Sequence, residues 1–107
     1  MPIIRIDFDG EKVSDKEILS LSKSIQKIVS QSTNIEDVFV YANSPQIKIN
    51  IAPIEIFIKM SVEKTKNITE LMATIKSSLQ HWKKEKNFPQ SINLTIIPMN
   101  WKIEINI

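Results

Sequence analysis

The same local pattern occurs twice in this chain, and it restricts the fold to a small set. Each copy has an alternating apolar segment, then apolar residues at steps of three and four, then a second β-rich segment. Alternation with a period of two is typical of a strand, and steps of three and four are typical of an amphipathic helix. The predicted elements are a strand at 2–8, a helix from 15 to about 30, a strand at 36–41, a strand at 54–59, a helix at 68–82 and a strand at 92–97.

This order predicts two βαβ units in tandem. A helix between two strands returns the chain to the starting end of the sheet, so the two strands of each unit run parallel. We therefore expect one α/β (α+β) domain over 1–107, with pseudo-repeats at about 2–42 and 53–98. The expected architecture has two layers, a mixed sheet with two helices on one face, plus short extra strands.

Both predicted helices have start signals. Ser14 to Glu17 and Asn67 to Glu70 each have the form of a capping box, in which two side chains bond the free N–H groups of the first turn. Asn34 follows the first helical stripe and is expected to end that helix.

Two alternating segments lie outside the repeat, at 46–51 and 101–107. Both predict the extra strands. An unpaired apolar strand edge favours association with another chain. We therefore expect the last segment to pair with something, and a neighbouring subunit is the candidate.

Composition excludes several classes of function. The 107 residues include no cysteine, which excludes disulfide frameworks and thiolate metal sites. No apolar run reaches the roughly 18 residues of a membrane span, and the charged start is not a signal peptide. The one basic cluster, at 83–86, falls where a helix should end and complements its dipole. We expect a cytoplasmic protein with no cofactor, no metal, no nucleic acid and no membrane partner.

Pro2, directly after Met1, is the candidate catalytic residue. Removal of Met1 exposes a secondary amine at the head of the first strand, and apolar surroundings bring such an amine toward the near-neutral range of a general base. A structural use is the alternative, because proline tolerates the first position of a strand. Pro53 stands at the equivalent position of the second repeat as an ordinary amide, which favours that alternative.

The chain resembles the tautomerase superfamily, and within it the two-repeat members typified by macrophage migration inhibitory factor. The resemblance covers the whole chain in layout. In sequence it rests on the start Met-Pro-Ile-Ile, on the strand and pocket-lining end at 53–62, and on Pro-Met-Asn at 98–100. The chain is more similar to an uncharacterised bacterial branch than to the cytokine.

The resemblance implies roles for individual residues. Pro2 matches the catalytic base, and Val62 falls where a backbone N–H contributes to the pocket. Thr33 stands where cytokine-like members have a pocket lysine, Thr95 where they have an asparagine, and Asn93 at a tyrosine position. Thr95 is therefore a substrate-binding candidate, although two of the usual polar partners are changed.

A developing negative charge on a carbonyl oxygen needs a cation, and Arg5 and Lys59 are the candidates. Alternation places Arg5 on the strand face opposite Pro2 and about 10 Å further along. Arg5 and Asp7 then have a structural alternative, since the resemblance implies trimers whose open sheet faces line a central channel. Lys59 is either a polar-face residue or a substrate anchor contributed across an interface.

These residues leave three hypotheses for function. The resemblance implies a homotrimeric keto-enol tautomerase or isomerase, with the Pro2 amine as general base on a small α-keto acid-like carboxylate. The altered pocket positions suggest an inactive tautomerase-fold oligomer that serves as a binding protein. A ferredoxin-like binding module has the same element order, but the aromatic run at 37–41 lacks the glycine and basic residues of RNA-binding members.

Overall fold

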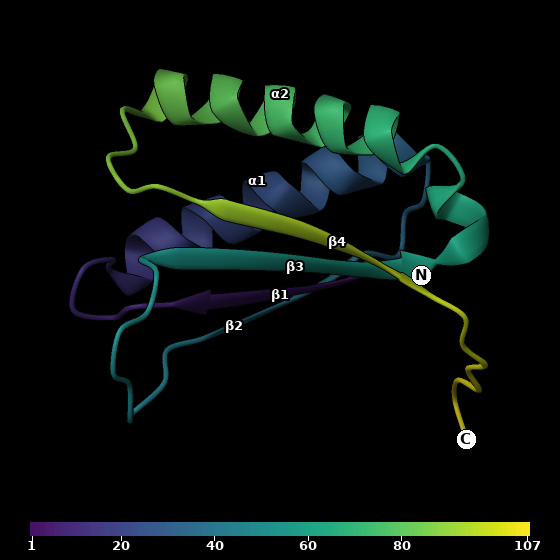
Figure 1. Cartoon of the computed structure of the whole chain (residues 1–107), viewed down its shortest axis with the longest axis horizontal. Coiled ribbons are helices and arrows are strands. Elements are labelled where there is room, and N and C mark those ends of the chain that lie inside the picture. The colour runs from purple at the N-terminus through teal and green to yellow at the C-terminus, as the bar shows by residue number, and fades with distance from the viewer.

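The computed structural model describes all residues from Met1 to Ile107. Its elements follow the predicted order, strand, helix, strand, twice over (Figure 1). In chain order they are β1 (Ile3–Phe8), α1 (Asp15–Thr33), β2 (Phe39–Asn43), β3 (Ile54–Ser61), the short 3-10 helix η1 (Val62–Thr65), α2 (Ile68–Lys86) and β4 (Asn93–Met99).

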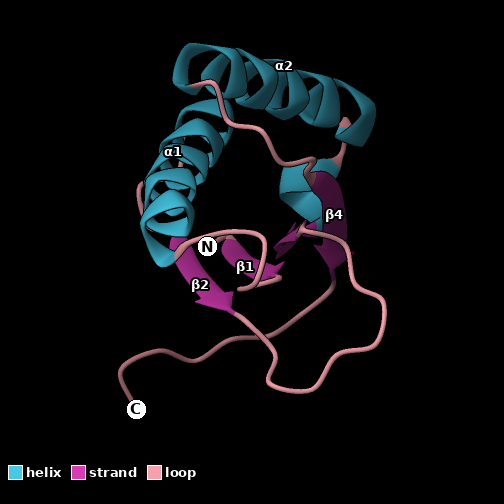
Figure 2. Ribbon diagram, turned by 90° about the vertical axis from the view of Figure 1, so that its left-hand side faces the viewer, coloured by secondary structure: helices cyan, strands magenta, loops and turns pink.

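The four strands form one mixed sheet in the order β2-β1-β3-β4. The outer pairs, β1 with β2 and β3 with β4, are parallel, and each is joined through a helix. The central pair, β1 with β3, is antiparallel. Both helices cover the same face of the sheet, which gives two layers (Figure 2). The predicted fold class, two βαβ units with both helices on one face, is confirmed.

Alternation along the strands separates a helix face from an open face. On β3 every second residue is buried beneath the helices, from Ile54 to Met60. On β1, Ile4, Ile6 and Phe8 are buried in the same way. The helices contribute their own apolar stripes, and the resulting core contains 17 buried residues. The residues between, such as Arg5 and Phe57, lie on the open face, which no helix covers.

The two capping signals have different outcomes. The Ser14 hydroxyl accepts the Glu17 N–H at 3.1 Å, and Glu17 accepts the Ser14 N–H at 3.0 Å, so this capping box is confirmed. The one at Asn67 is wrong, because its side-chain amide donates to Glu70 at 2.6 Å and makes no bond to the helix backbone. The chain enters α2 directly from η1, which leaves Asn67 outside the usual cap geometry. Asn34 ends α1 with a left-handed conformation (φ 57°), as predicted.

Neither helix is long and apolar enough to cross a bilayer.

The two extra strands are not formed, and this part of the fold prediction is wrong for the single chain. Residues 46–51 and 101–107 are irregular. A strand needs a neighbouring backbone as well as a two-sided pattern. Residues 44–53, which we call the strap, instead cross from β2 to β3 beyond the open face, and the C-terminal segment leaves β4 on the same side of the sheet (Figures 1 and 2).

Candidate functional site

Pro2 lies immediately before β1, on the helix face of the sheet. Its side chain is fully buried, and its carbonyl accepts the Phe39 N–H at 3.2 Å. The β1–β3 register pairs Ile3 with Lys59, so its continuation by one residue places Pro2 beside Met60. Met60 is completely buried. The residue 2 nitrogen is therefore set in an apolar environment at one end of the sheet.

Met1 precedes Pro2 and is partly buried. With Met1 attached, the Pro2 nitrogen is an amide and has no basic lone pair. The base that the sequence suggests exists only after Met1 is removed.

Val62 lies at the same end of the sheet as Pro2. It is the first residue of η1, which follows β3 without a break, and its side chain is 45% exposed. The first N–H groups of a helix have no acceptor within the helix. This end of the sheet therefore combines an apolar position for the residue 2 nitrogen with N–H groups at a helix start.

Arg5 and Thr95 lie together on the open face, on either side of Phe57. The register pairs Arg5 with Phe57 on one edge of β3 and Phe57 with Thr95 on the other. The Arg5 guanidinium stacks over the Phe57 ring, 4.7 Å from its centre, and Arg5 Nε donates to Asp7 Oδ2 at 3.2 Å. Arg5 thus has both an aromatic and an acidic partner within its own chain.

The sheet separates the five candidate residues into two groups. Pro2 and Val62 belong to one end of the sheet, with Pro2 on the helix face. Arg5, Lys59 and Thr95 occupy open-face positions of β1, β3 and β4. Within one chain the candidate base and the candidate cations do not converge.

The side chains of Thr33 and Asn93 both form hydrogen bonds within the chain. The Thr33 hydroxyl donates to the Val29 carbonyl within α1 at 2.7 Å. The Asn93 amide donates to Glu55 Oε1 across the sheet at 2.8 Å. Both side chains therefore contribute to local structure.

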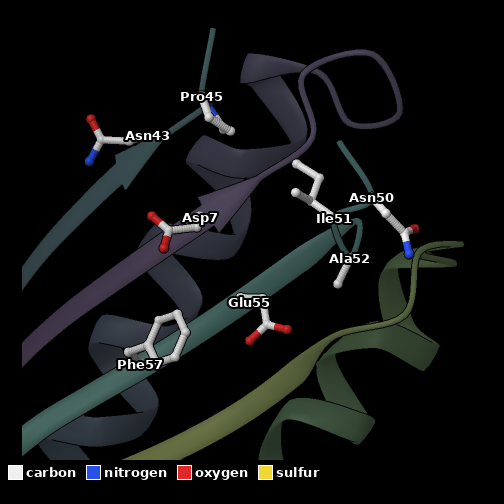
Figure 3. A pocket seen from close by; sticks show the side chains of 8 residues that line it. All are labelled: Asp7, Asn43, Pro45, Asn50, Ile51, Ala52, Glu55 and Phe57. Carbon is white, nitrogen blue, oxygen red and sulfur yellow. The ribbon is translucent and has the colours of Figure 1, made fainter. Parts of the chain in front are cut away.

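A concavity on the open face was not predicted from the sequence. It has a volume of about 500 Å³ and lies at the end of β1 opposite Pro2, between the sheet and the strap (Figure 3). Asp7 and Pro2 are five residues apart, or about 16 Å along an extended strand. The residues that line it are Asp7, Asn43, Pro45, Asn50, Ile51, Ala52, Glu55 and Phe57.

The strap owes its position to polar contacts with the β1–α1 turn. Lys48 Nζ donates to Asp9 Oδ1 and lies 3.5 Å from Glu11 Oε2. The Gly10 N–H donates to the Ser44 hydroxyl at 3.1 Å. The hydrogen bond from Lys48, and then the one from the Glu11 N–H, lower the pKa of Asp9 below its ordinary value of 3.8. The bond to Asp9 raises the pKa of Lys48 above its ordinary 10.5.

These pKa shifts predict how stability depends on pH. Because the folded-state pKa of Asp9 is lowered, its contribution is present above pH 3.8 and is lost as pH falls through the lowered pKa. The contribution of Lys48 is present below pH 10.5 and is lost as pH rises through the raised pKa. The Asp9–Lys48 pair is therefore intact across the neutral range.

Lys48→Met removes the main cause of the lowered Asp9 pKa, so we expect acid unfolding to begin at a higher pH than in the unmodified chain. An acid titration followed by far-ultraviolet circular dichroism measures the midpoint. Lys27→Met, at an exposed position of α1, is the matched control and should leave the midpoint unchanged. Identical midpoints for Lys48→Met and the unmodified chain would show that the pair does not hold the fold.

Comparisons with known proteins identify the architecture. No protein-family model matches the chain, and no curated protein matches it. A 5-carboxymethyl-2-hydroxymuconate delta-isomerase is similar in structure with a TM-score of 0.69 at 10% identity, over 98% of this chain and 88% of that one. A macrophage migration inhibitory factor-like protein from Entamoeba histolytica gives 0.66 at 15% identity, over 96% and 95%. A fused 4-OT wild-type asymmetric trimer gives 0.64 at 13% identity, over 97% and 92%.

These similar structures are members of the tautomerase superfamily. Their TM-scores of 0.64 to 0.69 establish a shared architecture, and their identities of 10% to 15% leave the reaction open. The matches cover 96% to 98% of this chain, and the chain therefore has the tautomerase-superfamily fold.

Proposed function

We propose that this chain, once Met1 is removed, is a keto-enol tautomerase that acts on a small α-keto acid in the cytoplasm. The Pro2 amine is its general base. The observation that carries the proposal is the position of the residue 2 nitrogen, beside the buried Met60 and at the same end of the sheet as the start of η1. The similar isomerase structure supports a proton-transfer reaction on this fold.

The chemistry follows from the two kinds of group at this end. The uncharged Pro2 nitrogen takes a proton from the carbon next to the substrate carbonyl, and the C–H electron pair forms the enol double bond. Negative charge then gathers on the carbonyl oxygen, where converging donors stabilise it. The Val62 N–H supplies one donor, and the protonated amine returns its proton to complete the tautomerisation.

The substrate carboxylate calls for a cation, which we assign to Arg5 or Lys59 of a neighbouring subunit, with Thr95 as a further polar contact. The sheet separates these open-face residues from Pro2 within one chain, so only a second copy can bring them to the base. In a site shared between subunits, the Pro2 amine of one chain and an open-face cation of its neighbour contact the same substrate.

Self-association has independent support from the surface. Phe39 and Tyr41 on β2 are 44% and 58% exposed, and Ile105 in the C-terminal segment is 66% exposed. Neither outer edge of the sheet, on β2 or on β4, is paired. A partner chain that covers these groups stabilises them, and the similar 4-OT structure is itself a trimer.

We therefore expect a homotrimer with a mass of about three times the chain mass of 12.3 kDa. Sedimentation equilibrium at micromolar concentration measures this mass. A chain shortened after Met99 lacks the exposed isoleucines of the C-terminal segment and should dissociate at a higher concentration. A clean monomer of the complete chain would contradict both the trimer and the shared site.

The direct test of activity is ketonisation of phenylpyruvate enol, followed by its ultraviolet absorbance, with protein whose mass establishes the loss of Met1. The proposal predicts catalysis above the buffer rate.

The second candidate is an inactive oligomeric binding protein of the same fold. It is favoured by the internal bonding of Thr33 and Asn93, which removes two side chains from any pocket. Absence of turnover with several enolisable keto acids, in a trimer that lacks Met1, would support this candidate over the enzyme.

A further inference from the structure

We propose that folding closes access to the Met1–Pro2 bond, so that Met1 is removed only before the chain has folded. A chain that folds with Met1 attached then stays without its catalytic base. The proposal rests on the proposed function, in which Pro2 is the base, and it states how that function is switched on. The partner that it requires is an aminopeptidase that removes an initial methionine.

The reaction is the hydrolysis of one peptide bond. Water adds to the Met1 carbonyl, the C–N bond to Pro2 breaks, and methionine leaves as the free amino acid. The Pro2 nitrogen takes up a proton and becomes a secondary amine. An aminopeptidase encloses the first residues of its substrate, so Met1, Pro2 and the start of β1 must leave the sheet before this bond is cut.

The residues on both sides of the bond are held against the protein. The Pro2 side chain is fully buried, and Met1 is partly buried. The Pro2 carbonyl accepts the Phe39 N–H at 3.2 Å, which joins residue 2 to the start of β2. The first residues of a domain are poorly ordered unless contacts of this kind hold them. The Met1–Pro2 bond is therefore not carried on a free tail.

The strand that follows Pro2 is paired along both of its edges, because β1 lies between β2 and β3. The register pairs Ile3 with Phe39 on one side and with Lys59 on the other, and Ile4 is paired on both sides in the same way. Ile4 is also completely buried. Release of the first four residues therefore breaks the pairing with both neighbouring strands and exposes the side chains of Pro2 and Ile4.

This arrangement sets the size of the expected protection. Where opening and closing are fast, cleavage of a protected bond follows the population of the open form. Exposure of two fully buried aliphatic side chains lowers that population by about 10²-fold or more. We therefore expect the folded chain to lose Met1 at least about 100-fold more slowly than an extended peptide does.

The bond is accessible while the chain is being made. β1 gains its second neighbour only after β3 has been synthesised, and β3 ends at Ser61. At about 5–20 residues per second, synthesis to this point takes on the order of 3–12 s. Folding then closes the bond. Chains with and without Met1 form two folded populations that do not interconvert.

Purified methionine aminopeptidase, followed by intact mass, measures the trimming independently of any tautomerase activity. The folded chain that retains Met1 is prepared by expression with an aminopeptidase inhibitor. A peptide of residues 1–8 gives the rate for an extended substrate. The matched control is the same folded chain with Met-Pro-Gly-Ser-Gly in place of Met1, which carries the Met–Pro bond on a flexible tail. We expect similar rates for the peptide and the control, and a rate at least about 100-fold lower for the folded chain.

A refolding experiment tests the timing. The chain that retains Met1 is unfolded in urea and diluted into buffer, and the aminopeptidase is either present during refolding or added after refolding is complete. We expect loss of Met1 when the enzyme is present during refolding, and retention of Met1 when it is added afterwards.

Trimming of the folded chain at the rate of the tailed control would overturn the proposal, as would equal loss of Met1 in the two refolding arms. A peptide that resists the aminopeptidase would contradict the removal of Met1 itself, and with it the proposed base. Slow trimming of the folded chain supports the proposal whether or not the trimmed protein is a tautomerase. Failure of the enzyme and failure of this proposal are therefore distinguishable.

Discussion

Pro2→Ala is expected to keep the fold and to lower kcat/KM for phenylpyruvate tautomerisation by about 10²–10⁴-fold, the range that a positioned general base contributes. An alanine amine is not part of a ring buried beside Met60, so its direction is no longer set by the start of β1. Steady-state kinetics on mass-verified protein measure the loss.

Pro53→Ala is the matched control. Pro53 precedes β3 as Pro2 precedes β1, but its nitrogen is an amide inside the chain. Its replacement is expected to change stability and to leave kcat/KM unaltered. If Pro2→Ala retained the full rate, proline would have only a structural use at both strand starts.

The second large effect concerns the core. Ile56 lies in the middle of β3, one of the two central strands, and is completely buried between the sheet and the helices. Ile56→Ala removes buried methyl groups and leaves a cavity, so we expect the free energy of unfolding to fall by about 2–5 kcal/mol. Urea unfolding at a fixed protein concentration measures the difference.

Ile49→Ala provides the comparison. Ile49 lies in the strap and is 91% exposed, although its sequence alternation resembles that of Ile56. Its replacement is expected to change stability by less than about 0.5 kcal/mol. Equal losses for the two isoleucines would mean that the strap packs against something in solution, such as a second copy of the chain.

Alternation and helical periodicity predict the fold because they report local physics. A half-buried strand must present apolar side chains at every second position, as Ile54 to Met60 do. A helix that packs on one face of a sheet must bury one apolar stripe of side chains. The same alternation correctly places Arg5 on the face opposite Pro2. It fails at 46–51 and 101–107, since a two-sided segment becomes a strand only where a neighbouring backbone is available.

The candidate site is predicted less completely, because it depends on contacts between distant residues. Asp7 pairs with Glu55 through the register of β1 and β3. These strands are distant in sequence, because β1 ends at Phe8 and β3 begins only at Ile54. The contact of Lys48 with Asp9 joins the strap to a turn 39 residues earlier. Neither contact has a local signal in the sequence. Asp7 and Glu55 line the concavity that the sequence did not predict, and the Lys48–Asp9 contact joins the strap to the β1–α1 turn.

The central claim is that the Pro2 nitrogen acts as a free amine. Its most direct test compares two proteins that differ by one residue, the chain that begins at Pro2 and the same chain with one alanine added before Pro2. The addition converts the amine to an amide and leaves every side chain in place. We predict tautomerase activity in the first protein and a loss of about 10²-fold or more in the second. Equal activity in both would contradict the claim.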